Sequence, residues 1–150
     1  MIERARAIAA AHAHREGPLL PVLQAVQAEF GYIDDSVVPG VAHELNLTRA
    51  EVHGVITFYH DFRRTPPGRQ IVRVCVAEAC QARGSRAVVQ GVEAALRVRL
   101  GETRPDGAYT LDAVYCLGLC ASGPAAVVDG ALVGRLDVQG LIDRLNEVAR

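Results

Sequence analysis

The chain of 150 residues contains no lysine, and all sixteen of its basic residues are arginine. Without lysine there is no P-loop lysine, no Schiff base to pyridoxal phosphate and no lysine acting as a general base. The sequence also lacks a G-x-G-x-x-G pattern, so nothing in it predicts a dinucleotide-binding loop. These absences exclude several common catalytic and cofactor-binding chemistries.

Long apolar runs are also missing. No stretch approaches the roughly 18 to 20 apolar residues that a membrane-spanning helix needs. The N-terminal segment MIERARAIAAAHAHREG is interrupted by charged residues and histidines, so it lacks the continuous apolar part of a secretion signal. We therefore expect a cytoplasmic protein without direct membrane insertion, in a compartment that keeps thiols reduced.

The composition is that of a soluble globular protein, with 50% hydrophobic residues, 22% charged residues and a net charge of -1. This balance gives no overall attraction to nucleic acid. Residues 46–62 have the pattern of the second half of a helix-turn-helix but lack a basic recognition face. A plain helix hairpin is the favoured interpretation, and a helix-turn-helix DNA-binding module is the alternative from a different class.

Two prolines and a glycine in residues 63–69 interrupt the pattern of the chain and mark a linker. We predict a domain boundary there, with a helical bundle over residues 1–65 and a second domain over residues 66–150. In the first half, Thr48-Arg49-Ala50-Glu51 is a capping-box pattern that opens a helix. The side chains expected to point inward from this helix are those of Val52, Ile56 and Tyr59.

The second half alternates between strand and helix patterns. The predicted elements are strands at 70–76, 109–115, 125–128 and 131–134, a helix capped by Ser85 and a last helix capped by Asp137. Asp129-Gly130 is a two-residue hairpin signal between the last two strands. The order β-α-β-β-β-α is compatible with a thioredoxin-like sheet, so the predicted fold class is α/β.

Four cysteines, Cys75, Cys80, Cys116 and Cys120, form a C-x4-C and a C-x3-C pattern. Cys75 lies near the end of the first predicted strand and Cys80 in the loop that follows. Cys116 and Cys120 bracket the loop after the second predicted strand. If these strands are neighbours in the sheet, both loops lie at one end, and they supply the two pairs of thiolates that a [2Fe–2S] cluster needs.

Other uses of four cysteines remain open at this point. Structural zinc favours tighter C-x2-C pairs, disulfides do not suit a reducing compartment, and a dithiol oxidoreductase normally uses C-x-x-C. An inert core thiol is a reasonable alternative for Cys75 alone, because its strand is apolar. No histidine has Rieske spacing to any cysteine, so a cluster here would have thiolate ligands only and a low, ferredoxin-like potential.

A cluster with four thiolates carries a charge of about -2, and about -3 after reduction. A buried charge of this size must be met by hydrogen bonds, which backbone amides supply where side chains do not block them. Gly84, Gly118 and Gly123 lie next to the two cysteine pairs. We expect these glycines to leave amides open toward the cluster, or simply to form turns.

The cysteine pattern and the segments LLPVLQAVQAEFGYI, LNLTRAEVHGVITFYHDF and VYCLGLCASGPAAVVDG together resemble the thioredoxin-like [2Fe–2S] ferredoxin family. The resemblance implies a helical N-terminal bundle followed by a thioredoxin-like domain with the cluster on Cys75, Cys80, Cys116 and Cys120. It also implies a non-catalytic electron-carrier subunit of an NAD-linked oxidoreductase complex. The implied partner is a flavoprotein subunit with FMN, NAD(H) and a [4Fe–4S] cluster.

Within the family, VHGVITFYHDFR and YCLGLC look most like the gamma subunit of soluble NAD-dependent formate dehydrogenase. This implies a further, larger subunit that oxidises formate at molybdenum or tungsten. The equivalent subunits of respiratory NADH-quinone oxidoreductase and of NAD-reducing hydrogenases are the alternatives. The respiratory subunit more often has LGAC followed by AP, whereas here Leu119 precedes Cys120 and residues 121–124 read ASGP.

Overall fold

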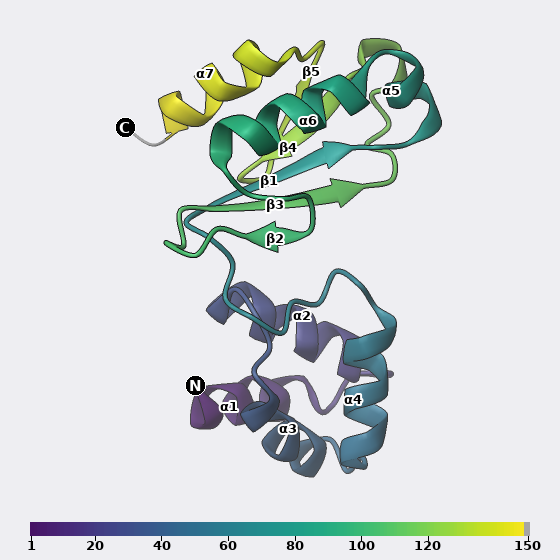
Figure 1. Ribbon diagram of the computed structural model, residues 1–150. Helices are drawn as coiled ribbons and strands as arrows, with labels where there is room; N and C mark the ends of the chain where they lie inside the picture. The colour runs from purple at the N-terminus through teal and green to yellow at the C-terminus, as the bar shows by residue number, and fades with distance from the viewer. Residues whose placement is uncertain (149–150) are drawn as a thin grey trace. The chain divides into compact units, whose positions relative to one another are not determined.

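The structure is a computed structural model that describes residues 1–148, with side chains through Glu147, so the end of the predicted second domain lies outside it. The chain divides into two compact units, Met1–Pro66 and Pro67–Arg150 (Figure 1). This division falls one residue after the predicted boundary. No helix among residues 1–148 combines the length and the apolar character needed to cross a membrane.

All regular elements among the described residues of the first unit are helices. Its elements are α1 (Ile2–His12), α2 (Leu19–Phe30), the 3-10 helix η1 (Asp35–Val37), α3 (Val38–Glu44) and α4 (Arg49–Phe58). Gly31 ends α2 in the left-handed conformation, with φ +81°, where the missing Cβ removes the steric penalty. Aliphatic side chains from all of these helices form one buried core.

The predicted capping box begins α4, since the Glu51 amide donates to Thr48 Oγ1 at 3.2 Å and the Thr48 amide donates to Glu51 Oε2 at 2.8 Å. Val52 and Ile56 point inward as predicted. The prediction for Tyr59 was wrong, because its side chain is 43% exposed. The helix ends at Phe58 and the Tyr59 backbone turns to the extended region, so the helical stripe does not reach it.

The second unit contains a five-stranded sheet in the order β2-β3-β1-β4-β5. The strands are β1 (Gln70–Cys75), β2 (Glu102–Thr103), β3 (Tyr109–Val114), β4 (Ala125–Val128) and β5 (Ala131–Gly134). β1 is central and pairs in parallel with β3 and antiparallel with β4. β4 and β5 form the predicted hairpin, and the Asp129-Gly130 turn has positive φ at both residues.

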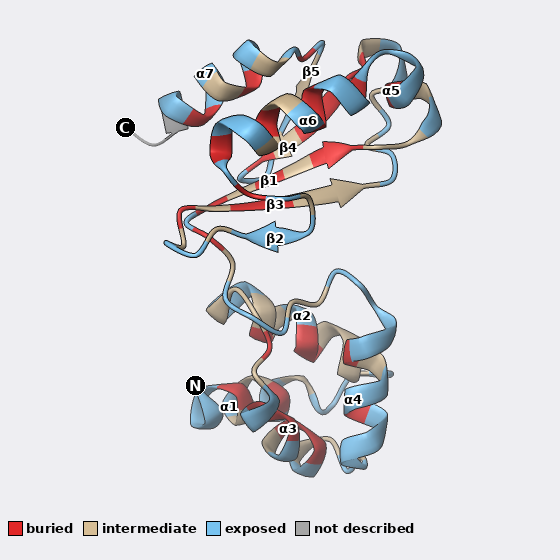
Figure 2. Cartoon of the chain, viewed as in Figure 1, coloured by how far each residue is buried: buried red, intermediate tan, exposed pale blue. Residues whose placement is uncertain are grey.

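Helices α6 (Ser85–Leu96) and α7 (Val138–Val148) cover one face of this sheet and contact each other (Figure 1). Val72, Val74 and Leu111 lie fully buried in the core beneath these helices. In Figure 2 buried residues appear along β1, in part of β3 and at several positions of α6. Asp137 begins α7 as predicted, since its carboxylate accepts from the Gly140 amide at 2.7 Å.

Three details of the second unit differ from the sequence-based expectation. The short helix α5 (Glu78–Ala82) and the two-residue strand β2 were not predicted. Ser85 does not cap α6: Gly84 holds the capping position with φ +95°, and the Ser85 hydroxyl is buried without a hydrogen-bond partner among the described residues. A capping hydroxyl requires extended backbone outside the helix, whereas Ser85 is already its first residue.

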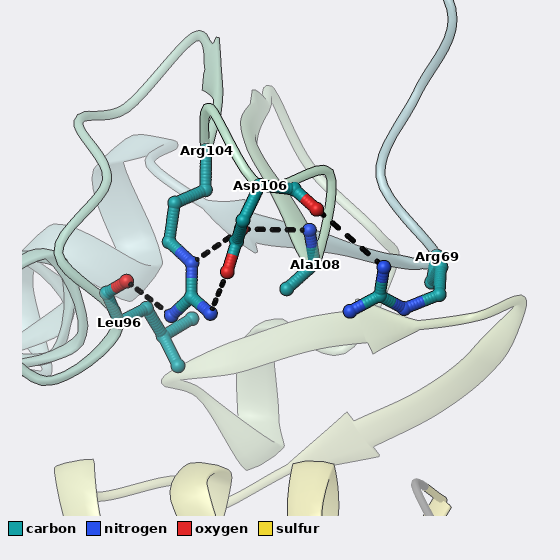
Figure 3. Close-up of polar contacts among 5 residues, drawn as sticks. All are labelled: Arg69, Leu96, Arg104, Asp106 and Ala108. Carbon is teal, nitrogen blue, oxygen red and sulfur yellow. Dashed lines mark hydrogen bonds and ion pairs between the residues drawn. The ribbon is translucent and has the colours of Figure 1, made fainter.

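The ends of β1 and β3 that lie away from the cysteines are joined by an arginine–aspartate network (Figure 3). Arg104 pairs with both carboxylate oxygens of Asp106 and donates to the Leu96 carbonyl oxygen, while Arg69 donates to the Asp106 carbonyl oxygen. Hydrogen bonds from Arg104, and then from the Ala108 amide, hold the pKa of Asp106 well below its usual range. The turn before β3 is thereby fixed to the start of β1.

The capping box gives the first testable expectation. Thr48→Ala should reduce the free energy of unfolding of the full chain by about 1 kcal/mol near neutral pH, because one helix-end amide loses its acceptor. Hydrogen bonds from the Thr48 amide and hydroxyl lower the pKa of Glu51. That contribution is present above the unfolded pKa of Glu51 and is lost as pH falls through the lower folded pKa.

Urea unfolding followed by circular dichroism at neutral and acidic pH measures this difference, which should shrink in acid. Thr57→Ala is the matched control, because the Thr57 hydroxyl only donates back to carbonyl oxygens within α4. An equal loss in both variants would contradict the role of the capping box.

Candidate metal centre

The parallel pairing of β1 with β3 brings the two cysteine segments together. Cys75 is the last residue of β1 and lies opposite Val114, the last residue of β3. The Val76 amide extends the pairing by donating to the Val114 carbonyl oxygen at 2.9 Å. Cys116 follows two residues later, so the two segments leave the sheet at the same edge, as predicted.

The other two cysteines lie on short helical segments. Cys80 lies in α5, not in a loop as expected from the sequence, and Cys120 begins the 3-10 helix η2 (Cys120–Ser122). After β1 the helix α5 carries Cys80, whereas the segment between Cys116 and Cys120 precedes η2 and includes the Gly118 amide that donates to Cys116 Sγ. The expectation for Cys80 was wrong in element type but right in placing it just beyond the end of β1.

The four sulfur atoms lie close together in two pairs. The Sγ atoms of Cys116 and Cys120 are 3.7 Å apart, and Cys75 and Cys80 pack together in one small buried cluster. Cys120 interacts electrostatically with both Cys75 and Cys80, which links the two pairs. Among residues 1–148, no group of three or more His, Cys, Asp or Glu side chains is placed around a single metal-ion position.

The separation within the second pair suits a shared metal ion. Two thiolates bound to one tetrahedral ion at about 2.3 Å, the zinc–thiolate bond length, lie about 3.8 Å apart. The 3.7 Å between Cys116 Sγ and Cys120 Sγ agrees with that value. Two such pairs, each holding one iron, are what a four-thiolate diiron core requires, so the residues present fit a [2Fe–2S] cluster.

The two pairs differ in their exposure to solvent. Cys75 and Cys80 are each only 2% exposed and pack with Ala125 and neighbouring apolar side chains, including Leu117 and Leu119. Cys116 and Cys120 are exposed. The site is therefore sealed on the side of the first pair and open on the side of the second pair.

Backbone amides surround the Cys75 sulfur. Burial disfavours its thiolate, but hydrogen bonds from the Ala77 amide, the Cys80 thiol and the amides of Cys116 and Leu117 outweigh it, so the pKa of Cys75 is lowered. These donors come from both cysteine segments. A negatively charged sulfur at this position is thus stabilised by the backbone itself.

The pKa values of Cys80 and Cys120 are shifted in the opposite direction to that of Cys75. Burial, and then donation to the Cys75 sulfur, raise the pKa of Cys80. Donation to the Cys116 sulfur, and then repulsion from its charge, raise the pKa of Cys120.

Two of the three predicted glycines lie against the sulfurs. The Gly118 amide donates to Cys116 Sγ at 3.4 Å, and Gly118 has φ +75°, which favours a residue without Cβ. A Cβ on Gly123 would lie 3.1 Å from Cys80 Sγ, closer than ordinary side-chain contacts. Gly84 instead caps α6, so its role is to form the turn.

Sequence reasoning missed the amide donors at Ala77 and Leu117, because a backbone hydrogen bond has no residue signature. It also missed the backbone of Cys116, which has φ +98°. Positive φ is uncommon for a residue with a Cβ and concentrates at functional sites. Here it belongs to the segment that directs the amides toward the first pair.

The fold and the four-cysteine site together define a thioredoxin-like iron–sulfur protein, and comparison with known sequences agrees. Residues 5–149 match the thioredoxin-like [2Fe–2S] ferredoxin family, and the chain belongs to this family. The resemblance, the fold class and the [2Fe–2S] cofactor inferred from the sequence are thereby confirmed.

Its relatives include subunits of an NADH-quinone oxidoreductase and of a hydrogenase. The chain is 37% identical over 141 residues to the E 2 subunit of NADH-quinone oxidoreductase from Rhizobium meliloti, covering 94% of this chain and 84% of the relative. It is 34% identical over 122 residues to the HndA subunit of the NADP-reducing hydrogenase from Solidesulfovibrio fructosivorans, covering 81% of this chain and 71% of the relative.

A solved structure shares the fold. The NAD+-reducing [NiFe]-hydrogenase in its air-oxidized state superimposes on 88% of this chain with a TM-score of 0.73 and 24% identity. The chain spans only 23% of the length of that hydrogenase chain. At this identity the comparison shows a common fold and no more.

The unequal exposure of the two pairs predicts unequal thiol reactivity. In cluster-free, reduced protein, Cys116 and Cys120 should react with iodoacetamide faster than Cys75 and Cys80, since burial of the first pair outweighs both the lowered pKa of Cys75 and the raised pKa of Cys120. Timed alkylation followed by peptide mass spectrometry measures the four rates. In guanidinium chloride all four should react at similar rates, and equal rates in the folded protein would contradict the described burial.

Proposed function

We propose that this chain carries its [2Fe–2S] cluster on Cys75, Cys80, Cys116 and Cys120 and acts as an electron-transfer subunit of a cytoplasmic NAD-linked oxidoreductase. The observation that supports it most directly is the parallel pairing of β1 with β3, which brings the two cysteine segments to one edge of the sheet. Each cysteine pair would supply two of the four thiolates that hold the cluster.

The surroundings suit a cluster that accepts one electron at a time. Reduction takes its charge from about -2 to about -3, and the amides of Ala77, Leu117 and Gly118 supply donors without adding charge. The buried first pair shields one side from solvent, while the exposed second pair leaves a side through which a partner can approach.

The proposed redox partner is a flavoprotein subunit with FMN, NAD(H) and a [4Fe–4S] cluster. Hydride transfer at NAD moves two electrons and a cluster holds one, so the two must exchange through a flavin. The chain itself has no lysine and no G-x-G-x-x-G pattern. We therefore propose that it carries electrons but does not turn over substrate alone.

For the parent enzyme we propose a soluble NAD-dependent formate dehydrogenase, with a larger molybdenum or tungsten subunit that oxidises formate. The support is the resemblance of residues 52–63 and 115–120 to the gamma subunit of that enzyme, with Leu119 before Cys120 and the sequence ASGP after it. The second candidate is the equivalent subunit of an NADH-quinone oxidoreductase or a hydrogenase. It is favoured by the 37% identity to the Rhizobium subunit and the 34% identity to the hydrogenase subunit.

Metal analysis tests the cluster and its ligands. Anaerobically purified full chain should contain two iron and two acid-labile sulfide per chain, since each pair of thiolates completes one iron. Cys120→Ser should lose or sharply alter the visible spectrum. Ala121→Ser is the matched control, because it adds a hydroxyl beside the site and keeps all four thiols.

One zinc per chain without sulfide in the wild-type protein would refute the cluster assignment. An unchanged spectrum in Cys120→Ser would remove Cys120 from the ligand set while leaving the cluster itself in place.

The parent enzyme is tested by recovering the complex from its native host through a tag on this chain. Recovery with a molybdenum- or tungsten-containing, formate-oxidising subunit and NAD+-dependent formate oxidation is the expected result. Recovery in a membrane complex that reduces quinone, or with a nickel subunit that oxidises hydrogen, would favour the second candidate. The isolated chain should oxidise no formate, and turnover by it would contradict the carrier role.

A further inference from the structure

Arg83 joins the two segments that carry the cysteines. It follows α5 directly, and its backbone amide donates to the Cys80 carbonyl oxygen at 3.1 Å. Its side chain reaches the other segment, where Arg83 Nε donates to the Gly123 carbonyl oxygen at 2.9 Å. One side chain thus links the helix that holds Cys80 to the segment that follows Cys120.

The contact lies directly beside a cysteine sulfur. A Cβ placed on Gly123 would be 3.1 Å from Cys80 Sγ and 3.3 Å from Arg83 Cδ, so both atoms pack against the same point of the backbone. The absence of a side chain at Gly123 is what allows this approach. The arginine stem and the Cys80 sulfur are consequently neighbours across a single glycine.

The guanidinium brings a fixed positive charge to this position, because arginine stays protonated at any physiological pH. Reduction of the cluster adds one negative charge. A nearby positive charge stabilises the reduced form more than the oxidised form, which raises the reduction potential. Arg83 is exposed to solvent, so salt should weaken the effect without abolishing it.

We propose that Arg83 is a positioning residue for electron transfer: it holds the 116–124 segment against Cys80, and its charge raises the reduction potential of the cluster. This inference rests on the proposed ligand set. It adds a residue outside the cysteine motif that sets how readily the carrier accepts an electron.

The test is a redox titration of the full chain, followed by electron paramagnetic resonance at low and high ionic strength. Arg83→Gln keeps a hydrogen-bond donor but removes the charge, and its midpoint potential should shift to a more negative value. Arg83→Lys keeps the charge and should stay closer to wild type. Arg86→Gln is the matched control, because the Arg86 guanidinium contacts the Gln81 side chain instead, and it should shift the potential much less.

The difference between wild type and Arg83→Gln should shrink as salt is added, whereas a purely structural effect would not. A potential unchanged in Arg83→Gln, or equal shifts in Arg83→Gln and Arg83→Lys, would overturn the inference. If Arg83→Gln takes up no cluster while Arg83→Lys does, the charge is needed to hold the site, which supports it. Arg83→Lys failing to take up cluster while Arg83→Gln succeeds would overturn it.

The wild-type iron and sulfide content separates this inference from the proposed function. A wild-type chain without a cluster refutes the proposed function and the inference with it. A loaded wild-type chain whose potential ignores Arg83 refutes the inference alone.

Discussion

The parallel pairing of β1 with β3 is the constraint on which the cysteine site depends. Parallel neighbours end at the same edge of a sheet, so Cys75 and the segment after Val114 leave it together. The β-branched residues of β1 keep that strand in the centre, with α6 and α7 packed over one face. The arginine–aspartate network at the opposite ends fixes the same pairing from the other side.

Electrostatics then determines which residues can line the site. A cluster charge near -2 in a half-buried position needs hydrogen-bond donors. Additional acidic side chains would repel this charge, and bulky side chains would block the donors. The structure meets this need with backbone amides at Ala77, Leu117 and Gly118, with a close approach at Gly123, and with an arginine held beside Cys80. Cys116, with φ +98°, begins the segment that contains the Leu117 and Gly118 amides.

The sequence predicted features with a strong local signature. The capping box at Thr48 and the hairpin at Asp129-Gly130 each follow from short-range chemistry, and both are found in the structure. Prediction failed where the signature is too short or is overruled. The five residues of α5 complete too few turns to show a period, and Ser85 yields the capping position to Gly84, whose positive φ the turn requires.

For the cysteines, the position in the sheet was predictable from the sequence but the burial was not. That all four cysteines lie at one sheet edge followed from strand order, whereas the difference in burial between the pairs did not, because it depends on packing around Ala125 and Leu117. This difference bears directly on an electron carrier. Complete burial would protect the cluster but lengthen the path to a partner, and complete exposure would shorten the path but open both cysteine pairs to water and oxidants. Burying one pair and exposing the other reconciles the two needs within a single small sheet.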